Sequence, residues 1–311
     1  MSAMRALGIG LALCGAAAVA AGYGGALHPA LDALAVFRVP LGLATALLLA
    51  LLWRPLWLVA PGVALMALAV GPRLLASRDI DVTGVAGAAP AQDLVLYQKN
   101  LLFRLPSRDL VVADILARAP DIVTLQEVSR PNQAVPTALR AAYPAQNFCE
   151  YRVNGGPAVL SRWPMVPGSA ACGPGLAAMQ VETPMGRIWA VSIHLRWPWP
   201  YQQPHQLELL EPMLREMQGP KVIGGDFNNV AWSEGVARVE RASGTARIGR
   251  EAVTFALPFG GLGVGIDHIL ASSGAAGTIT VLERLGSDHR GLLGRISLGL
   301  PPVPGADALS G

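Results

Sequence analysis

The chain has 311 residues, of which 52% are hydrophobic and 14% charged, and its formal net charge is +3. Residues 1–78 contain only six charged side chains, whereas the remainder alternates polar and apolar runs as soluble domains do. From residue 93 on, 19 Lys and Arg residues stand against 18 Asp and Glu residues, so no basic stripe indicates a long polyanionic partner. We therefore predict a lipid-embedded first part and a water-soluble second part.

Three apolar runs fill the first part: Ala6 to Leu27, Val39 to Trp53 and Leu56 to Val70. The first run reaches the roughly 20 residues that span a bilayer core, and the other two have about 15 each. We therefore predict that residues 1–78 form a membrane anchor of about three transmembrane helices. Arg54-Pro55 would then form either a tight cytoplasmic turn between the two shorter spans or the tip of a re-entrant hairpin. A cleaved signal peptide is the alternative for the first run, but the two further runs argue against simple secretion.

The basic residues of the first part predict its orientation. Arg5 precedes the first run, the connection from Pro29 to Arg38 carries one acid and one base, and Arg54 separates the second and third runs. A cytoplasmic N-terminus with three crossings fits this distribution, although Arg73 and Arg78 after the third run argue the other way. We therefore expect a multi-pass protein of the cell (inner) membrane with its soluble part outside the cytoplasm.

Cysteine usage bears on the same question. Cys149 and Cys172 are the only cysteines in the soluble part. Such a pair is compatible with a disulfide formed in an oxidising compartment. Two buried, reduced thiols are the alternative, because buried free cysteine is common.

After a linker at residues 79–91, rich in Gly and Ala, residues 92–300 are long enough to bury one substantial core. Their apolar patterns predict alternating strands and helices. Strands are expected at Leu94–Gln98, Asp121–Gln126, Lys221–Gly225, Ile266–Leu270 and Leu292–Ile296, a hairpin at Met179–Leu195, and helices from Ser107 to Ala119 and around Gln206–Gln218. We expect the tail at residues 301–311 to be disordered.

Seven polar residues come at or just after the ends of apolar strands, where α/β folds gather their ligand sites. They are Asn100, Glu127, His194, Asp226, Asn228, Asp267 and His289. The pairs Asp288-His289 and Asp226-x-Asn228 offer the acid, histidine and amide groups that metal-assisted phosphoester hydrolysis requires.

Six short segments carry a family resemblance: Gln98-Lys99-Asn100, Leu125-Gln126-Glu127, Ser192-Ile193-His194-Leu195, Gly224-Gly225-Asp226-Phe227-Asn228, Ile266-Asp267-His268-Ile269-Leu270 and Gly286-Ser287-Asp288-His289. In these segments and in their order, the chain resembles the endonuclease/exonuclease/phosphatase superfamily. The resemblance implies an α/β fold, a four-layer α-β-β-α sandwich of two mixed sheets, which the transmembrane helices would precede here.

The resemblance also implies a metal site. Glu127 would be the principal ligand of Mg²⁺ or Mn²⁺, with Asn100 nearby and Asp288 completing the oxygen-rich site. Oxygen ligands suit these ions, because Mg²⁺ is usually held by one or two carboxylates.

By the same resemblance, His289 would be the general base and Asp267 would hold its imidazole in the required tautomer. Asp226 and Asn228 would position the nucleophile and donate to the developing phosphorane oxygen, and His194 would bind or protonate the phosphoryl group.

Two further histidines, His205 and His268, match no family role. His268 alternates with Asp267 on its strand, so we expect its side chain to point to the opposite face and to pack there.

The segment Arg196-Trp197-Pro198-Trp199-Pro200-Tyr201 directly follows His194. Its aromatic side chains could stack on a base or enter a membrane interface. A rigid proline-rich loop over the rim of the site is the alternative.

Together these features predict a membrane-anchored, divalent-metal-dependent phosphoester hydrolase with a nuclease-like attack of activated water on a phosphodiester. A phospholipid or small-molecule phosphodiesterase or phosphatase is the alternative. A catalytically inactive membrane scaffold is disfavoured because no expected catalytic position is substituted. The expected partners are a phosphoester substrate (nucleic acid, phospholipid or small molecule) and the bilayer, and no protein partner can be inferred.

Overall fold

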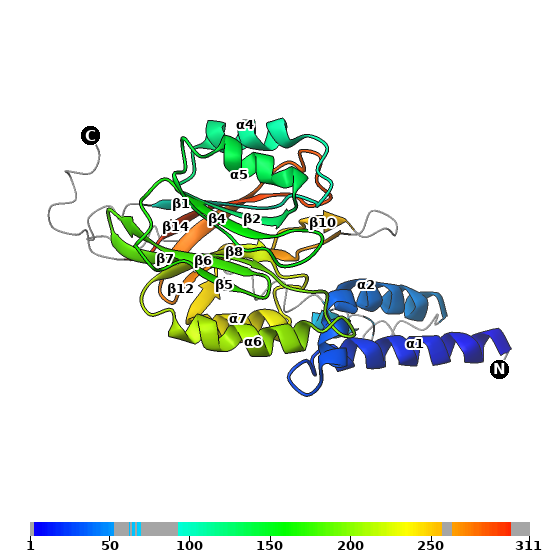
Figure 1. Ribbon diagram of the computed structural model, residues 1–311. Helices are drawn as coiled ribbons and strands as arrows, with labels where there is room; N and C mark the ends of the chain where they lie inside the picture. The colour runs from blue at the N-terminus through cyan, green and yellow to red at the C-terminus, as the bar shows by residue number, and fades with distance from the viewer. Residues whose placement is uncertain are drawn as a thin grey trace, which may run out of the picture.

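The computed structural model describes residues 3–52, 62, 64–65, 67–69, 93–256 and 263–299. Within these residues two six-stranded sheets pack face to face, and helices cover their outer faces (Figure 1). Helices α4 (Arg108–Arg118) and α5 (Ala134–Ala138) cover one sheet, and α6 (Gln203–Glu216) and α7 (Glu234–Ser243) cover the other. The predicted four-layer sandwich is confirmed.

The first sheet has the strand order β13-β14-β1-β2-β4-β3. Its strands are β13 (Ala276–Val281), β14 (Leu292–Ser297), β1 (Leu94–Asn100), β2 (Ile122–Val128), β4 (Gly156–Ser161) and β3 (Ala145–Phe148). The central strands β1 and β2 are parallel, and Asn100 is in register with Gln126. The last residue of β1 therefore lies beside Glu127.

The second sheet has the order β5-β6-β7-β8-β12-β9. Its strands are β5 (Ala171–Gly173), β6 (Leu176–Thr183), β7 (Gly186–His194), β8 (Lys221–Asp226), β12 (Asp267–Ser272) and β9 (Thr245–Arg247). His194 is in register with Asp226, and Asp226 with Asp267. These three polar residues therefore form a row at one end of the sheet.

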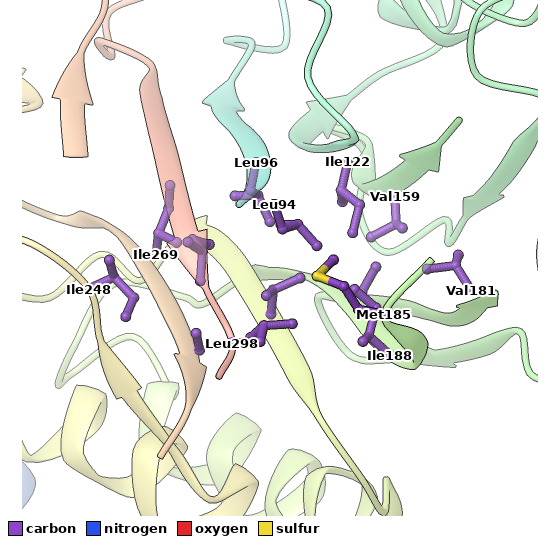
Figure 2. Packing of buried hydrophobic residues seen from close by; sticks show 14 of the residues in the cluster. Leu94, Leu96, Ile122, Val159, Val181, Met185, Ile188, Ile248, Ile269 and Leu298 are labelled. Carbon is purple, nitrogen blue, oxygen red and sulfur yellow. The ribbon is translucent and has the colours of Figure 1, made fainter. Parts of the chain in front are cut away.

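The interior between the sheets is apolar. Figure 2 shows Leu94, Leu96 and Ile122 of the first sheet facing Met185 and Ile188 near the hairpin of the second, and all five are buried. Leu94 and Leu96 lie on the same face of their sheet because alternate residues of a strand point the same way. Two further buried clusters lie beneath the covering helices, one under α4 and α5 and one under α6 and α7.

The strands and helices predicted for the soluble part are confirmed, with boundaries shifted by a few residues. The predicted hairpin turns between Thr183 and Gly186. The remaining elements were not predicted: helices α5 and α7, strands β3, β4, β5, β9 and β13, the short 3-10 helix η3 (Pro131–Gln133), and the two-stranded sheet of β10 (Phe255–Ala256) and β11 (Gly263–Val264).

A disulfide joins Cys149, directly after β3, to Cys172 in β5, with the Cα atoms 5.5 Å apart. Of the two alternatives that the sequence leaves open for these cysteines, the structure has the disulfide. Since β3 and β5 are edge strands of different sheets, the bond fastens the two sheets together at one edge.

Two N-terminal helices, α1 (Ala3–Ala21) and α2 (Pro29–Leu52), pack against each other and project from the sandwich (Figure 1). The predicted connection from Pro29 to Arg38 is wrong, because these residues form the first turns of α2. Proline is well tolerated in the first turn of a helix. Asp32 and Arg38 broke the apolar pattern on which the prediction rested, yet both side chains are buried against other parts of the protein.

Of the described residues, one helix is long and apolar enough to cross a bilayer: Pro29–Leu51, with a mean hydropathy of 2.1. The apolar stretch of α1, Ala6–Ala21, is shorter. The third predicted span lies largely outside the described residues. Three of the arginines used to predict the orientation also lie outside the described residues: Arg54, Arg73 and Arg78. The same holds for the predicted linker at residues 79–91 and the predicted tail at residues 301–311, so these assignments stay predictions.

Candidate active site

The structure brings the eight predicted site residues together at one end of the sandwich, where polar residues end or follow several strands of both sheets. Asn100 and Glu127 come from the first sheet, and Asp288 and His289 from the turn that leads into β14. His194, Asp226, Asn228 and Asp267 come from the second sheet and the turn after β8.

Glu127 lies on a β-bulge. The pairing of β2 with β4 shifts between Leu125 and Val128, and Glu127 has a φ of +55°. Positive φ is uncommon for a residue other than glycine, and bulges commonly redirect a side chain beside a functional site. The Phe103 N–H donates to Oε2 of Glu127 at 2.6 Å, and Nδ2 of Asn100 lies 3.4 Å from Oε1. Burial, reinforced by the like charge of Asp288, raises the pKa of Glu127.

Asp226 is at the centre of the site and is only 1% exposed. Its Oδ2 accepts a hydrogen bond from Nδ2 of Asn100 at 2.9 Å, and its Oδ1 accepts one from the Asn228 N–H at 2.8 Å. The Nε2 atoms of His194 and His289 lie 3.6 and 3.8 Å from Oδ2. Burial raises the pKa of Asp226 to about 7. Asn228 is fixed in turn, because its Nδ2 donates to the Leu195 carbonyl at 2.8 Å.

His289 and Asp267 form a buried pair with Nδ1 2.8 Å from Oδ2. The other oxygen of Asp267, Oδ1, accepts from Nε2 of Gln98 at 3.0 Å, and its backbone N–H donates to Oγ1 of Thr254 at 3.2 Å. Burial alone would lower the pKa of His289, but attraction by Asp267 and Asp226 outweighs it and raises the pKa to about 10.

The other histidines have different surroundings. Burial lowers the pKa of His194 to about 4, and the nearby His289 adds to the effect. His268 points away from the site, as predicted: its Nε2 lies 2.8 Å from the Asn229 carbonyl oxygen and its ring packs edge-on against Phe227. His205 is exposed and lies beside Glu208.

Several buried polar residues that support the site had no predicted role. Lys99 is fully buried in β1, and its Nζ donates to the carbonyls of Glu283 and His289, both at 3.2 Å. Oγ of Ser287 donates to the Asn100 carbonyl at 2.8 Å and accepts from the His289 N–H at 3.0 Å. The available signal was Lys99 near the end of a strand that begins as a buried apolar run, because a buried lysine needs partners.

The donor set fits a divalent cation. Glu127, Asp226, Asp267 and Asp288 place four carboxyl groups around one site, and the raised pKa values of Glu127 and Asp226 reflect the cost of this crowded, buried negative charge. Oxygen donors with excess negative charge are what Mg²⁺ and Mn²⁺ prefer. Asp226, Asp267 and His289 also place ligand atoms within 4.8 Å of one another. These three side chains are all buried, whereas Glu127 is half-buried and Asp288 is exposed. The carboxylates of Glu127 and Asp288 are therefore the more accessible ligands for a cation.

Solved structures share this fold at low sequence identity. An endonuclease/exonuclease/phosphatase from Beutenbergia cavernae is 20% identical, with a TM-score of 0.53 over 67% of this chain and 72% of that chain. D. rerio TDP2 complexed with a single-strand DNA product is 16% identical, with a TM-score of 0.54 over 66% of this chain and 98% of that chain. The human Nocturnin catalytic domain with a bound sulfate anion is 19% identical, with a TM-score of 0.52 over 68% and 96% of the two chains.

No curated protein matches the chain at a significant level. The model of the endonuclease/exonuclease/phosphatase family matches residues 98–289, which is more than half of the chain and contains all eight predicted site residues. The protein therefore belongs to the endonuclease/exonuclease/phosphatase family.

Proposed function

We propose that the protein is a membrane-anchored, divalent-metal-dependent hydrolase that cleaves a phosphodiester by attack of activated water. The observation that carries the proposal is the buried His289–Asp267 pair, which lies beside a cluster of carboxylates where the two sheets meet. A histidine oriented by a carboxylate is an established arrangement for general-base catalysis.

In this proposal, Glu127 and Asp288 would hold Mg²⁺ or Mn²⁺, with Asn100 beside them. When bound, the cation supplies positive charge that polarises the phosphoryl group, lowers the pKa of water and offsets the carboxylates that raise the pKa of His289. Asn100 also bridges Glu127 and Asp226, since its Nδ2 donates hydrogen bonds to both carboxylates and so fixes their relative position.

His289 would take the proton of the attacking water at Nε2. Its Nδ1 is engaged by Asp267, so Nε2 is the ring nitrogen left to accept a proton on the side of Asp226. Asp267 is itself held by Gln98 and Thr254, which fixes the direction of the ring. This arrangement keeps one tautomer of the neutral imidazole, as the reaction requires.

Asp226 and Asn228 would orient the water and the phosphoryl oxygens, with His194 as a further hydrogen-bonding group. The Asn228 N–H donates to Oδ1 of Asp226 and its Nδ2 donates to the Leu195 carbonyl, which fixes both the backbone and the side chain of Asn228. Because the pKa of His194 is lowered to about 4, its ring is neutral near pH 7. A neutral ring supports a role in which His194 binds the phosphoryl group by a hydrogen bond, rather than one in which it gives a proton to that group.

A phospholipid is the second candidate substrate, and the position of the aromatic segment 196–201 favours it. The indole of Trp197 packs edge-on against Phe255, 6.1 Å between centroids, and Phe255 packs on His289 at 4.9 Å. Trp199 and Tyr201 are 52% and 64% exposed. Trp199 and Pro198 line a small pocket together with Pro29 of α2. Exposed aromatics between the site and an apolar helix suit a membrane interface.

Activity screening of the full-length protein would test the function and separate the substrates. The protein in detergent and in liposomes is assayed with Mg²⁺ or Mn²⁺ against plasmid DNA, RNA, sphingomyelin, phosphoinositides and bis(4-nitrophenyl) phosphate. We expect metal-dependent release of product that is lost in Asp267→Asn and retained in the surface variant His205→Ala. Cleavage of plasmid that falls steeply with salt indicates a nuclease. Preference for lipid in liposomes indicates the second candidate, and no turnover of any phosphoester contradicts the proposal.

We also propose that the N-terminus lies in the cytoplasm and the catalytic domain outside it. The Cys149–Cys172 disulfide supports this orientation, because disulfides persist in oxidising compartments. Fusions after Ser77 to a reporter that is active only outside the cytoplasm would test it. Activity of a cytoplasm-only reporter at the same position, with free thiols on both cysteines, would overturn it.

A further inference from the structure

The anchor helix α2 is bound to the catalytic domain through one buried carboxylate. Asp32, in the first turn of α2, is 7% exposed. Its Oδ1 accepts from the Glu234 N–H at 2.6 Å, and its Oδ2 accepts from the Gly235 N–H at 3.0 Å and from Nδ2 of Asn229 at 3.3 Å. The first N–H groups of a helix have no partner within the helix. Asp32 therefore satisfies the first turn of α7 from a helix about 200 residues away in the sequence.

Asn229 belongs to the segment that carries Asp226 and Asn228, which we call the catalytic turn (residues 226–229). Its side chain therefore links Asp32 directly to this turn. Besides its bond to Asp32, Nδ2 of Asn229 donates to Oε1 of Gln203 at 2.7 Å. Nε2 of Gln203 in turn donates to the Phe227 carbonyl at 3.0 Å and to the Arg196 carbonyl at 2.6 Å. The network thus joins α2 to the backbone of the catalytic turn and to the start of the aromatic segment.

The contact has no room for an additional atom. A Cβ on Gly25, in the turn between α1 and α2, would lie 2.7 Å from Oδ1 of Asp32 and 3.1 Å from Cβ of Glu234. A Cβ on Gly235 would lie 2.6 Å from Nδ2 of Asn229 and 2.8 Å from Oε1 of Gln203. Close fit of this kind indicates a fixed interface, because packed interiors relax only in part when volume is added.

Apolar and aromatic contacts surround the carboxylate. Nε1 of Trp232 donates to the Ala35 carbonyl at 3.0 Å, and the Arg38 guanidinium lies 5.3 Å from the Trp232 ring. Ala35 and Val36 of α2 pack in one cluster with Val230, Val264 and Ile266. Val230 directly follows the catalytic turn and Ile266 directly precedes Asp267. The anchor therefore contacts both segments that lead to the site.

We propose that Asp32 is a positioning residue: it acts across the anchor interface, through Asn229 and α7, to hold the catalytic turn in its active geometry. The anchor is then a working part of the enzyme as well as its tether. Asp32 contacts none of the residues assigned to the metal or the phosphoryl group, so its effect is indirect. The inference rests on the proposed function only for the roles of Asp226 and Asn228.

Asp32→Ala in the full-length protein tests the proposal, with Ser233→Ala as the matched control. Both positions supply an oxygen to the N-terminus of α7, but Ser233 accepts only from the Val236 N–H, at 3.2 Å. Hydrogen exchange of the backbone amides of residues 226–236 is the readout that does not depend on activity. Turnover of bis(4-nitrophenyl) phosphate with Mn²⁺ is the second readout.

We expect Asp32→Ala to speed exchange across the catalytic turn and to lower kcat about tenfold or more with little change in KM, as loss of positioning does. Asp32→Asn keeps the shape of the side chain but offers one acceptor oxygen, so its exchange rates and kcat should lie between those of Asp32→Ala and the wild type. If Asp32→Ala does not fold, Asp32→Asn takes its place in the test. Ser233→Ala should change exchange only near Val236 and leave kcat unchanged.

Unchanged exchange of residues 226–229 in both Asp32 variants overturns the inference whatever the activity. A loss of kcat in Ser233→Ala equal to that in Asp32→Ala also overturns it, because the effect would then be general weakening of α7. If the wild type turns over no phosphoester, the proposed function fails by itself, and the exchange result still decides whether Asp32 holds the turn.

Discussion

His289 and Asp267 meet across the sandwich, with Nδ1 of His289 2.8 Å from Oδ2 of Asp267. His289 lies in the turn that leads into β14 of the first sheet, whereas Asp267 begins β12 of the second. Gln98 of β1 donates to the same carboxylate at 3.0 Å, so two segments of the first sheet hold one residue of the second. The pair therefore forms only when the two sheets are packed together.

We expect Asp267→Asn to lower turnover with little change in metal affinity. An asparagine that donates to Nδ1 would favour the wrong tautomer of His289, and general-base catalysis is typically worth about 10²- to 10⁴-fold in rate. Adding His289→Ala should cost much less than the product of the two single effects, because residues that act as a unit are not additive. Steady-state rates of the two single variants and the double variant decide this. Effects that multiply would show that the two side chains work independently.

Glu127→Gln should keep the fold and lose most of the affinity for Mg²⁺ or Mn²⁺. The substitution removes the negative charge but preserves the shape and the acceptor for the Phe103 N–H. Glu182→Gln is the matched control, because Glu182 is also a strand carboxylate but pairs with Arg187 on the surface. Calorimetric titration of each variant with the metal is the measurement. Metal binding by Glu127→Gln equal to that of the control would remove Glu127 from the site.

Local patterns in the sequence predict the strands and the polar residues at their ends, and the family resemblance implies the sandwich that brings these residues together. Apolar strands that end in a polar residue are visible along the chain, and parallel pairing of β7 with β8 places His194 beside Asp226. The start of α2 was not predictable in the same way. Asp32 breaks an apolar pattern, and nothing near it in the sequence indicates that its partners are the amides of Glu234 and Gly235. Contacts of such long range depend on the assembled fold.

The pH dependence of stability should report on His268. Burial lowers the pKa of this histidine to about 3, from an ordinary value of 6.5. Between these values the unfolded chain binds the additional proton, so stability is full above pH 6.5 and is lost as the pH falls. The expected slope approaches about 1.4 kcal/mol per pH unit.

His268→Gln can still donate to the Asn229 carbonyl but does not titrate. We therefore expect the difference in stability between the wild type and this variant to shrink as the pH is lowered from 7 towards 4, by the slope given above. Thermal unfolding of both proteins at a series of pH values is the measurement. Parallel curves for the two proteins would show that His268 is not held in its neutral form.

The disulfide should stabilise the catalytic domain without taking part in the chemistry. Cys149 and Cys172 are 23 residues apart, and a loop of that length is worth about 3 kcal/mol of unfolding free energy in the chain-entropy model. We expect Cys149→Ser combined with Cys172→Ser to lower the unfolding temperature and to abolish its sensitivity to reductant, while turnover well below that temperature is retained. Cys14→Ser, which removes the free cysteine of α1, is the control and should change neither property. If the double variant unfolds at the same temperature as the wild type in the absence of reductant, the disulfide adds no stability beyond the packing of the two edge strands it joins.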